Sequence, residues 1–263
     1  MDLGLRGKVA IITGGSEGIG KAAATSLAQE GASVVICARR KDVLDAAAQE
    51  IRGKTGSKIL GVPADVSNAE QVQIVVAKAV EAFGRLDIVV NNAGTSAAGN
   101  FETVDDEAWK RDMELKFYAA VRFARAAIPH MQKQGGGRII NITNLGGKQP
   151  GANSMPTSVT RAAGLALTKA LSKDLAKYNI LVNTVCIGVI KSGQHEHRVQ
   201  AAQRQNPSAT MDAFYSERAR GVPLGRVGEA REAGDVICFL ASERASYLTG
   251  TSINIDGGTS GVL

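Results

Sequence analysis

Residues 9–20 read VAIITGGSEGIG, a β-branched apolar run that passes into a glycine-rich turn. Gly14, Gly18 and Gly20 follow the spacing G-x-x-x-G-x-G. In a strand–turn–helix unit that binds a dinucleotide, such glycines permit a tight turn, close approach of the backbone to a pyrophosphate, and close helix–strand contact. The helix that begins here also offers free N–H groups to a phosphate. The expected cofactor-binding residues of this turn are Gly14, Ser16, Gly18, Ile19 and Gly20.

Apolar runs and segments of helical period alternate along the rest of the chain. The runs are apolar at nearly every position, which suits strands buried on both faces of a parallel sheet. We expect strands at residues 9–13, 33–37, 59–63, 87–90, 138–143, 180–186 and 252–255. Strict alternation of strand and helix indicates repeated βαβ units. The sequence therefore predicts one doubly wound α/β domain over residues 1–263, a seven-stranded parallel sheet flanked by about six helices.

Length and composition agree with a globular domain of this kind. The chain has 263 residues, of which 44% are hydrophobic and 21% charged, so disorder is excluded as the main state. No apolar run reaches the roughly 18 residues of a membrane span, and residues 1–8 lack the apolar core of a signal peptide. We expect a cytoplasmic protein with no membrane partner. The formal charge is +6, but no basic run or basic helix with interleaved aromatic residues accompanies it, so no nucleic-acid partner is expected.

The cysteines and histidines give no indication of a metal site. Cys37, Cys186 and Cys238 are far apart and lack the CxxC spacing, so neither a zinc site nor a disulfide framework is expected. His195 and His197 stand two residues apart, and on a helix their imidazoles would diverge. The sequence predicts no bound metal.

The end of the second expected strand bears on coenzyme choice. A carboxylate at this place binds the ribose 2′-hydroxyl of NAD, whereas an arginine accommodates the 2′-phosphate of NADP. Residues 37–40 read CARR and contain no acid. Arg39 and Arg40 therefore favour NADP(H) over NAD(H). The alternative is that the two arginines form a solvated helix entrance.

One segment, residues 191–221, breaks the alternation. It is polar and long for a connection, so we expect either a lid over a substrate site or a surface excursion. Its glutamine, arginine and histidine content is compatible with a polar or anionic substrate.

Five motifs occur in a fixed order: Thr13–Gly20, Asp65-Val66, Asn91–Gly94, Gly137–Thr143 and Asp256–Gly258. In order and spacing they resemble the short-chain dehydrogenase/reductase family, and the likeness covers essentially the whole chain. The resemblance implies a single Rossmann-type domain, a nicotinamide coenzyme, a small-molecule substrate and a homodimer or homotetramer. It also implies which further residues line the coenzyme: Asp65 and Val66 at the adenine, Asn92, Ala93 and Gly94 at the ribose and central sheet, and Gly188 and Ile190 at the nicotinamide.

The resemblance also places the catalytic residues, and here the chain departs from the family. The family uses Asn, Ser, Tyr and Lys; the corresponding positions hold Lys116, Asn144, Thr157 and Arg161. The sequence thus looks like a divergent member that lacks the usual tetrad. Tyr118 cannot supply the missing phenol, because two residues after Lys116 it should face another side of the helix.

The altered set keeps some chemical capacity. A threonine hydroxyl titrates far above neutral pH and needs another group to activate it. Arg161 keeps its charge and can hold ribose hydroxyls, and Asn144 can donate an amide N–H to a carbonyl oxygen. Lys116 is a candidate acid if it is desolvated beside Arg161, which would lower its pKa. The alternatives are a structural or solvent-facing Lys116, and Thr157 and Asn144 as polar lining without a catalytic role.

Two functional hypotheses follow. The first is an NADP(H)-dependent oxidoreductase that transfers hydride to or from a carbonyl, an alcohol or a conjugated enone with an altered proton-transfer set. The second is a catalytically silent NADP(H)-binding sensor or partner subunit, which four changed catalytic positions would explain.

Overall fold

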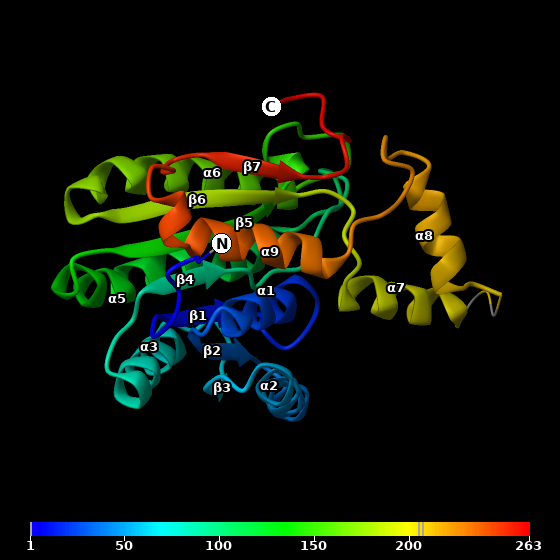
Figure 1. The fold of residues 1–263 in the computed structure, drawn as a ribbon. Coiled ribbons are helices and arrows are strands. Elements are labelled where there is room, and N and C mark those ends of the chain that lie inside the picture. The colour runs from blue at the N-terminus through cyan, green and yellow to red at the C-terminus, as the bar shows by residue number, and fades with distance from the viewer. Residues whose placement is uncertain (1, 205, 207) are drawn as a thin grey trace.

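A computed structural model describes residues 2–204, 206 and 208–263. Its seven strands form a single sheet in the order β3-β2-β1-β4-β5-β6-β7 (Figure 1), and every neighbouring pair is parallel. This confirms the predicted doubly wound sheet. The strands are β1 (Val9–Thr13), β2 (Ser33–Ala38), β3 (Ile59–Pro63), β4 (Ile88–Asn91), β5 (Gly137–Asn144), β6 (Ile180–Ile187) and β7 (Ser252–Ile255).

Six helices flank the sheet, as expected, and three more accompany them within the described residues. One face is covered by α1, α2 and α9, the other by α3, α5 and α6 (Figure 1). The additional three are α4, which leads into α5, and α7 and α8. The bounds are α1 (Gly18–Gln29), α2 (Lys41–Thr55), α3 (Ala69–Phe83), α4 (Asp106–Met113), α5 (Ala119–Lys133), α6 (Thr157–Asp174), α7 (Gly193–Gln203), α8 (Met211–Ala219) and α9 (Ala230–Ala241).

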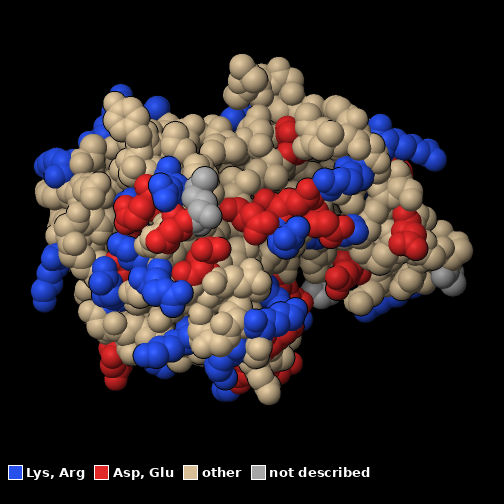
Figure 2. All heavy atoms as spheres, in the orientation of Figure 1, with Lys and Arg blue, Asp and Glu red and all other residues tan. Residues whose placement is uncertain are grey.

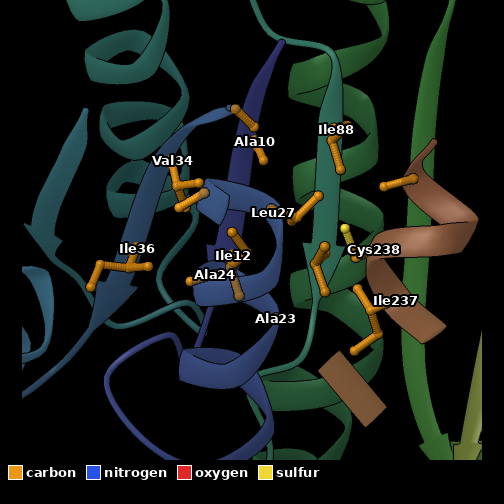
Figure 3. Packing of buried hydrophobic residues seen from close by; sticks show 14 of the residues in the cluster. Ala10, Ile12, Ala23, Ala24, Leu27, Val34, Ile36, Ile88, Ile237 and Cys238 are labelled. Atoms are coloured by element: carbon orange, nitrogen blue, oxygen red, sulfur yellow. The ribbon is translucent and has the colours of Figure 1, made fainter. Parts of the chain in front are cut away.

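The core lies between the sheet and its helices because alternate strand residues point to opposite faces. Ile12 and Val34 pack against Leu27 of α1 and Ile237 of α9 on one face (Figure 3). On the other face Ile11 belongs to the cluster that includes residues of α3 and α5. Both faces of the central strands are therefore buried, which is why their sequences are apolar throughout.

The sheet order places the functional region. The chain runs outward from β1 to β3 on one side, then returns to β4 on the other side of β1. Ligands of such sheets bind beyond the carboxyl ends of the strands, where the order reverses. The loops after β1 and β4 meet at this point.

Helices α7 and α8 form most of the segment that broke the sequence pattern, and they project to one side of the layered domain (Figure 1). They pack on each other through His195, whose ring centroid lies 5.3 Å from that of Phe214 and 5.7 Å from that of Tyr215. Gln194 Nε2 donates a hydrogen bond of 2.9 Å to the Gly94 carbonyl oxygen after β4. The segment is thus tied to the edge of the functional region.

Candidate active site

The glycine-rich turn after β1 has the backbone shape that its sequence predicts. Gly14 and Gly18 have φ values of +64° and +52°, a conformation that strongly favours glycine. A Cβ at Gly20 would overlap the Gly14 carbonyl oxygen and the Asn92 amide. That amide donates to the carbonyl oxygens of Thr13 (2.9 Å) and Gly14 (3.2 Å), which joins the turn to the end of β4. The turn is a backbone cradle that side chains would fill, and it fits a dinucleotide pyrophosphate.

A cleft of about 910 Å³ opens above this turn, within the size range of cofactor sites. It brings together all the sequence-predicted cofactor residues except Gly20, which does not line it. These lining residues are Gly14, Ser16, Gly18, Ile19, Arg39, Arg40, Asp65, Val66, Asn92, Ala93, Gly94, Arg161, Gly188 and Ile190. Helix α7 contributes to the cleft as well, through Gln194, His195 and Arg198.

One end of the cleft is charged. Arg40 forms an ion pair with Glu17 of the glycine-rich turn. Arg39 is exposed and, within the described residues, makes no ion pair. Hydrogen bonds from Ser67, and then the positive charge of Arg39, hold the pKa of Asp65 below its usual value. Asp65 therefore stays ionised at the carboxyl end of β3.

A buried polar cluster lies behind the opposite end of the cleft. Lys116 sits in a single π-helical turn, Glu114–Tyr118, between α4 and α5. Its ammonium group donates to the Asp112 carboxylate and, at 3.2 Å, to Thr157 Oγ1. The side chains of Lys116 and Asp112 are only 2% and 1% exposed. The other Asp112 oxygen accepts a 2.7 Å hydrogen bond from Thr160.

The charge state of Lys116 follows from these surroundings. Burial, and then the positive charge of Arg161, lower the pKa of Lys116 from 10.5 to about 8, while Asp112 opposes the shift. The inward, desolvated position that the acid hypothesis needs is therefore present. An amine with a pKa near 8 is protonated at neutral pH and can still release its proton.

Thr157 links this cluster to the cleft. It begins α6, is 5% exposed and lines the cleft. Its hydroxyl oxygen accepts from Lys116 and from the Ala97 backbone N–H at 2.9 Å. A hydroxyl has two acceptor lone pairs and one proton, so both acceptor positions of Thr157 are filled. Its remaining capacity is to donate its own proton.

Arg161 and Asn144 carry polar atoms with unused hydrogen-bonding capacity. One terminal nitrogen of Arg161 donates to the Ile142 carbonyl oxygen at 2.6 Å. Arg161 Nε and Asn144 Oδ1 are buried and have no hydrogen-bond partner within the described part of the chain. Burial lowers the pKa of Arg161 to about 10, so it remains charged at neutral pH. Buried polar atoms of this kind call for a ligand or water.

A small cavity of about 20 Å³ lies beside the cluster, lined among others by Asn91, Lys116, Asn141 and Arg161. Its lining combines these polar groups with apolar side chains, and its volume is enough for one water molecule.

Sequence reasoning missed Asp112 and Thr160. Asp112 stands four residues before Lys116 and so on the same helix face, a spacing that could have identified it. Tyr118 and Tyr178 are exposed, which confirms that Tyr118 points away from Lys116. No three His, Cys, Asp or Glu side chains among the described residues are arranged to hold a metal ion; the side chain of His197 lies outside the described part.

Figure 2 shows lysine and arginine side chains interspersed with acidic ones over the visible face. No helix among the described residues is both long and apolar enough to cross a membrane.

A family model described as enoyl-(acyl carrier protein) reductase matches residues 14–260. The chain is 34% identical to oxidoreductase UcpA of Salmonella typhimurium over 258 residues, 97% of this chain and 95% of that protein. L-Sorbose reductase from Gluconobacter frateurii, solved with NADPH and L-sorbose, has a TM-score of 0.95 and 37% identity over 100% of both chains. A short-chain type dehydrogenase/reductase from Mycobacterium marinum has a TM-score of 0.88 and 32% identity, covering 99% of this chain and 98% of that one.

These matches extend over essentially the whole chain. The chain belongs to the short-chain dehydrogenase/reductase family.

Proposed function

We propose that the chain is an NADP(H)-dependent oxidoreductase acting on a carbonyl, an alcohol or a conjugated enone, with Lys116 and Thr157 as its proton-transfer pair. In this proposal Lys116, Asn144, Thr157 and Arg161 take the places of the family's usual tetrad. The observation that carries it is the Thr157 hydroxyl, which has both lone pairs engaged, lines the cleft, and is backed by the Lys116 ammonium. The similarity to a reductase solved with NADPH supports the coenzyme.

The lining of the cleft fits the coenzyme part by part. The glycine-rich turn would hold the pyrophosphate, Arg39 the 2′-phosphate, and Asp65 with Val66 the adenine. Asn92, Ala93 and Gly94 would line the ribose and Gly188 with Ile190 the nicotinamide. The charged guanidinium of Arg161 would bind ribose hydroxyls, which gives its orphaned nitrogen a partner. When bound, NADPH supplies the hydride.

The proton follows a short path through the chain's own side chains. The substrate oxygen takes the Thr157 hydroxyl proton, and the Lys116 ammonium returns one to Thr157 Oγ1 across their hydrogen bond. Hydride and proton together convert the carbonyl into an alcohol, and Lys116 is left neutral. Thr157 thus never has to exist as an alkoxide. The adjoining cavity of about 20 Å³ admits a water that can reprotonate Lys116.

The charges of the buried cluster favour proton transfer toward the substrate. Lys116 and Arg161 carry two positive charges against the single negative charge of Asp112. The excess of one positive charge stabilises negative charge that develops on the substrate oxygen. Transfer of one proton to the substrate removes this excess. Asn144, which lines the cleft, can donate its amide N–H to the same oxygen. Ser96, Gln194 and His195 add polar groups to the lining, which supports a polar substrate.

A silent NADP(H)-binding subunit is the second candidate. The closed Lys116–Asp112 ion pair favours it, because such a pair can exist for packing and specificity alone. Turnover with any acceptor separates the two candidates.

Coenzyme binding provides the first test. NADPH is expected to bind at least about tenfold more tightly than NADH, and Arg39→Ala to remove about tenfold of the NADPH affinity, because a charge-assisted contact to the 2′-phosphate is lost. Nicotinamide fluorescence measures both. Arg125→Ala, an exposed arginine of α5 away from the cleft, is the matched control. Equal binding of the two coenzymes, or tighter NADH binding, would contradict the proposal.

The pH dependence of reduction provides a second test. The reaction needs charged Lys116, whose pKa is about 8, so kcat/KM is expected to fall about tenfold per pH unit above that value. The measurement is initial rate against pH with saturating NADPH. A flat profile up to about pH 10 rules out Lys116 as the acid.

The same pKa predicts an opposite trend in stability. The pKa of Lys116 is 10.5 in its ordinary state and about 8 in the folded chain, so the unfolded chain binds more protons between these values. The free-energy cost of burying the charged amine is therefore relieved as the pH rises through this range.

A further inference from the structure

Glu17 places a negative charge at the end of the cleft where the coenzyme phosphate is expected. It belongs to the glycine-rich turn, between Ser16 and Gly18. Its carboxylate forms an ion pair with Arg40, and the two side chains are 42% and 52% exposed. Both residues line the cleft beside Arg39. The sequence assigns both arginines to a phosphate, but the structure distinguishes them. Arg39 has no ion-pair partner among the described residues, whereas the charge of Arg40 is compensated by Glu17.

Glu17 also has a second favourable neighbour. A Cβ at Gly193, the first residue of α7, would lie 3.5 Å from the Glu17 carboxyl carbon. The side chain of Ser192, which precedes α7, makes no capping hydrogen bond. The first turn of α7 therefore offers N–H groups and a positive dipole end close to the carboxylate. If Arg40 turned to another partner, the Glu17 carboxylate would still have the positive end of α7 beside it.

Arg40 has two possible anionic partners, Glu17 and the coenzyme 2′-phosphate. The 2′-phosphate distinguishes NADPH from NADH, and Arg40 can pair with that phosphate or with Glu17. A phosphate that enters must displace the carboxylate and remain near its negative charge. NADH carries no such group and leaves the Glu17–Arg40 pair intact.

We propose that Glu17 determines coenzyme discrimination in this chain: it competes with the 2′-phosphate for Arg40 and holds NADPH affinity below what two free arginines would give. The inference rests on the proposed NADP(H) site. It assigns Glu17 a role in specificity, with Arg39 as the constant phosphate contact and Arg40 as the contested one.

The test is coenzyme binding to the full chain, followed by nicotinamide fluorescence without any substrate. Glu17→Gln keeps the size of the side chain and removes its charge. It is expected to tighten NADPH binding by about three- to tenfold and to change NADH binding by less than about twofold, with the difference shrinking at high salt. Glu50→Gln is the control, since Glu50 pairs with Lys21 and Lys54 and does not line the cleft.

A double-mutant cycle locates the effect on Arg40. Arg40→Ala is expected to cost about twofold in NADPH affinity when Glu17 is present and about tenfold in the Glu17→Gln background. No gain from Glu17→Gln, an equal gain for both coenzymes, or an equal gain from Glu50→Gln overturns the inference. If the unmodified chain binds neither coenzyme, the proposed function fails with it; if both bind and Glu17→Gln leaves their ratio unchanged, the role of Glu17 alone fails.

Discussion

Replacing Lys116 with methionine is expected to reduce kcat/KM for carbonyl reduction by about 10²- to 10⁴-fold, the usual contribution of a positioned general acid. Methionine keeps much of the volume of the lysine stem but has no proton to give. NADPH affinity is expected to change by less than about threefold, because Lys116 lies behind Thr157 and does not line the main cleft. The measurements are initial rates with a panel of ketone and enone acceptors and a parallel NADPH titration.

Thr160→Val is the matched control for this experiment. It removes the hydroxyl bonded to the same Asp112 carboxylate but leaves Lys116 and Thr157 in place. It is expected to lower stability while most of the turnover remains. Thr157→Val should behave like Lys116→Met, and Thr157→Ser should keep activity because it keeps the hydroxyl. Turnover that survives Lys116→Met unchanged excludes Lys116 as the proton donor, and its absence in every variant and in the unmodified chain favours the silent subunit.

Asp112→Ala is expected to lower the free energy of unfolding by about 3–5 kcal/mol, because it leaves Lys116 buried without its counter-ion. The two side chains are almost fully enclosed, so bulk solvent cannot screen the Lys116 charge that the lost carboxylate leaves behind. Urea unfolding near neutral pH measures the loss. The pKa of Lys116 should also fall further, since Asp112 is the group that raises it.

Removing both partners separates the cost of a broken ion pair from the cost of lost packing. The double variant Asp112→Leu with Lys116→Met puts apolar groups of similar volume in place of the pair, and is expected to recover most of the stability that Asp112→Ala loses. A loss of less than about 1 kcal/mol for Asp112→Ala would mean that the pair is not desolvated as the structure shows.

The sheet and the cofactor cradle were predictable from sequence because their determinants are local. Each strand is apolar at almost every position, so it is recognised without knowledge of its neighbours. The positive φ values of Gly14 and Gly18 and the close approach at Gly20 are requirements that only glycine meets well. The residues at the strand ends converge on one cleft because all seven strands are parallel.

The contacts that give the site its character are not local. Asp112 joins Lys116 from its own helix but Thr160 from α6, which is 48 residues away in sequence. Glu17 meets Arg40 only because the turn after β1 lies beside the end of β2. Helices α7 and α8 were not predicted because neither has a clear apolar face. They pack on each other through His195 and two aromatic rings.

The filled lone pairs of Thr157 have a consequence for the reverse reaction. While Lys116 is charged, the hydrogen-bond chain from Lys116 through Thr157 has one polarity and ends in a donor. An alcohol with its own proton to give finds no acceptor there. When Lys116 is neutral it can accept from Thr157 instead, the chain reverses, and the same hydroxyl oxygen becomes free to receive a proton. In the proposed mechanism, this pair of side chains is therefore expected to donate a proton to a ketone in neutral solution and to accept one from an alcohol in alkaline solution.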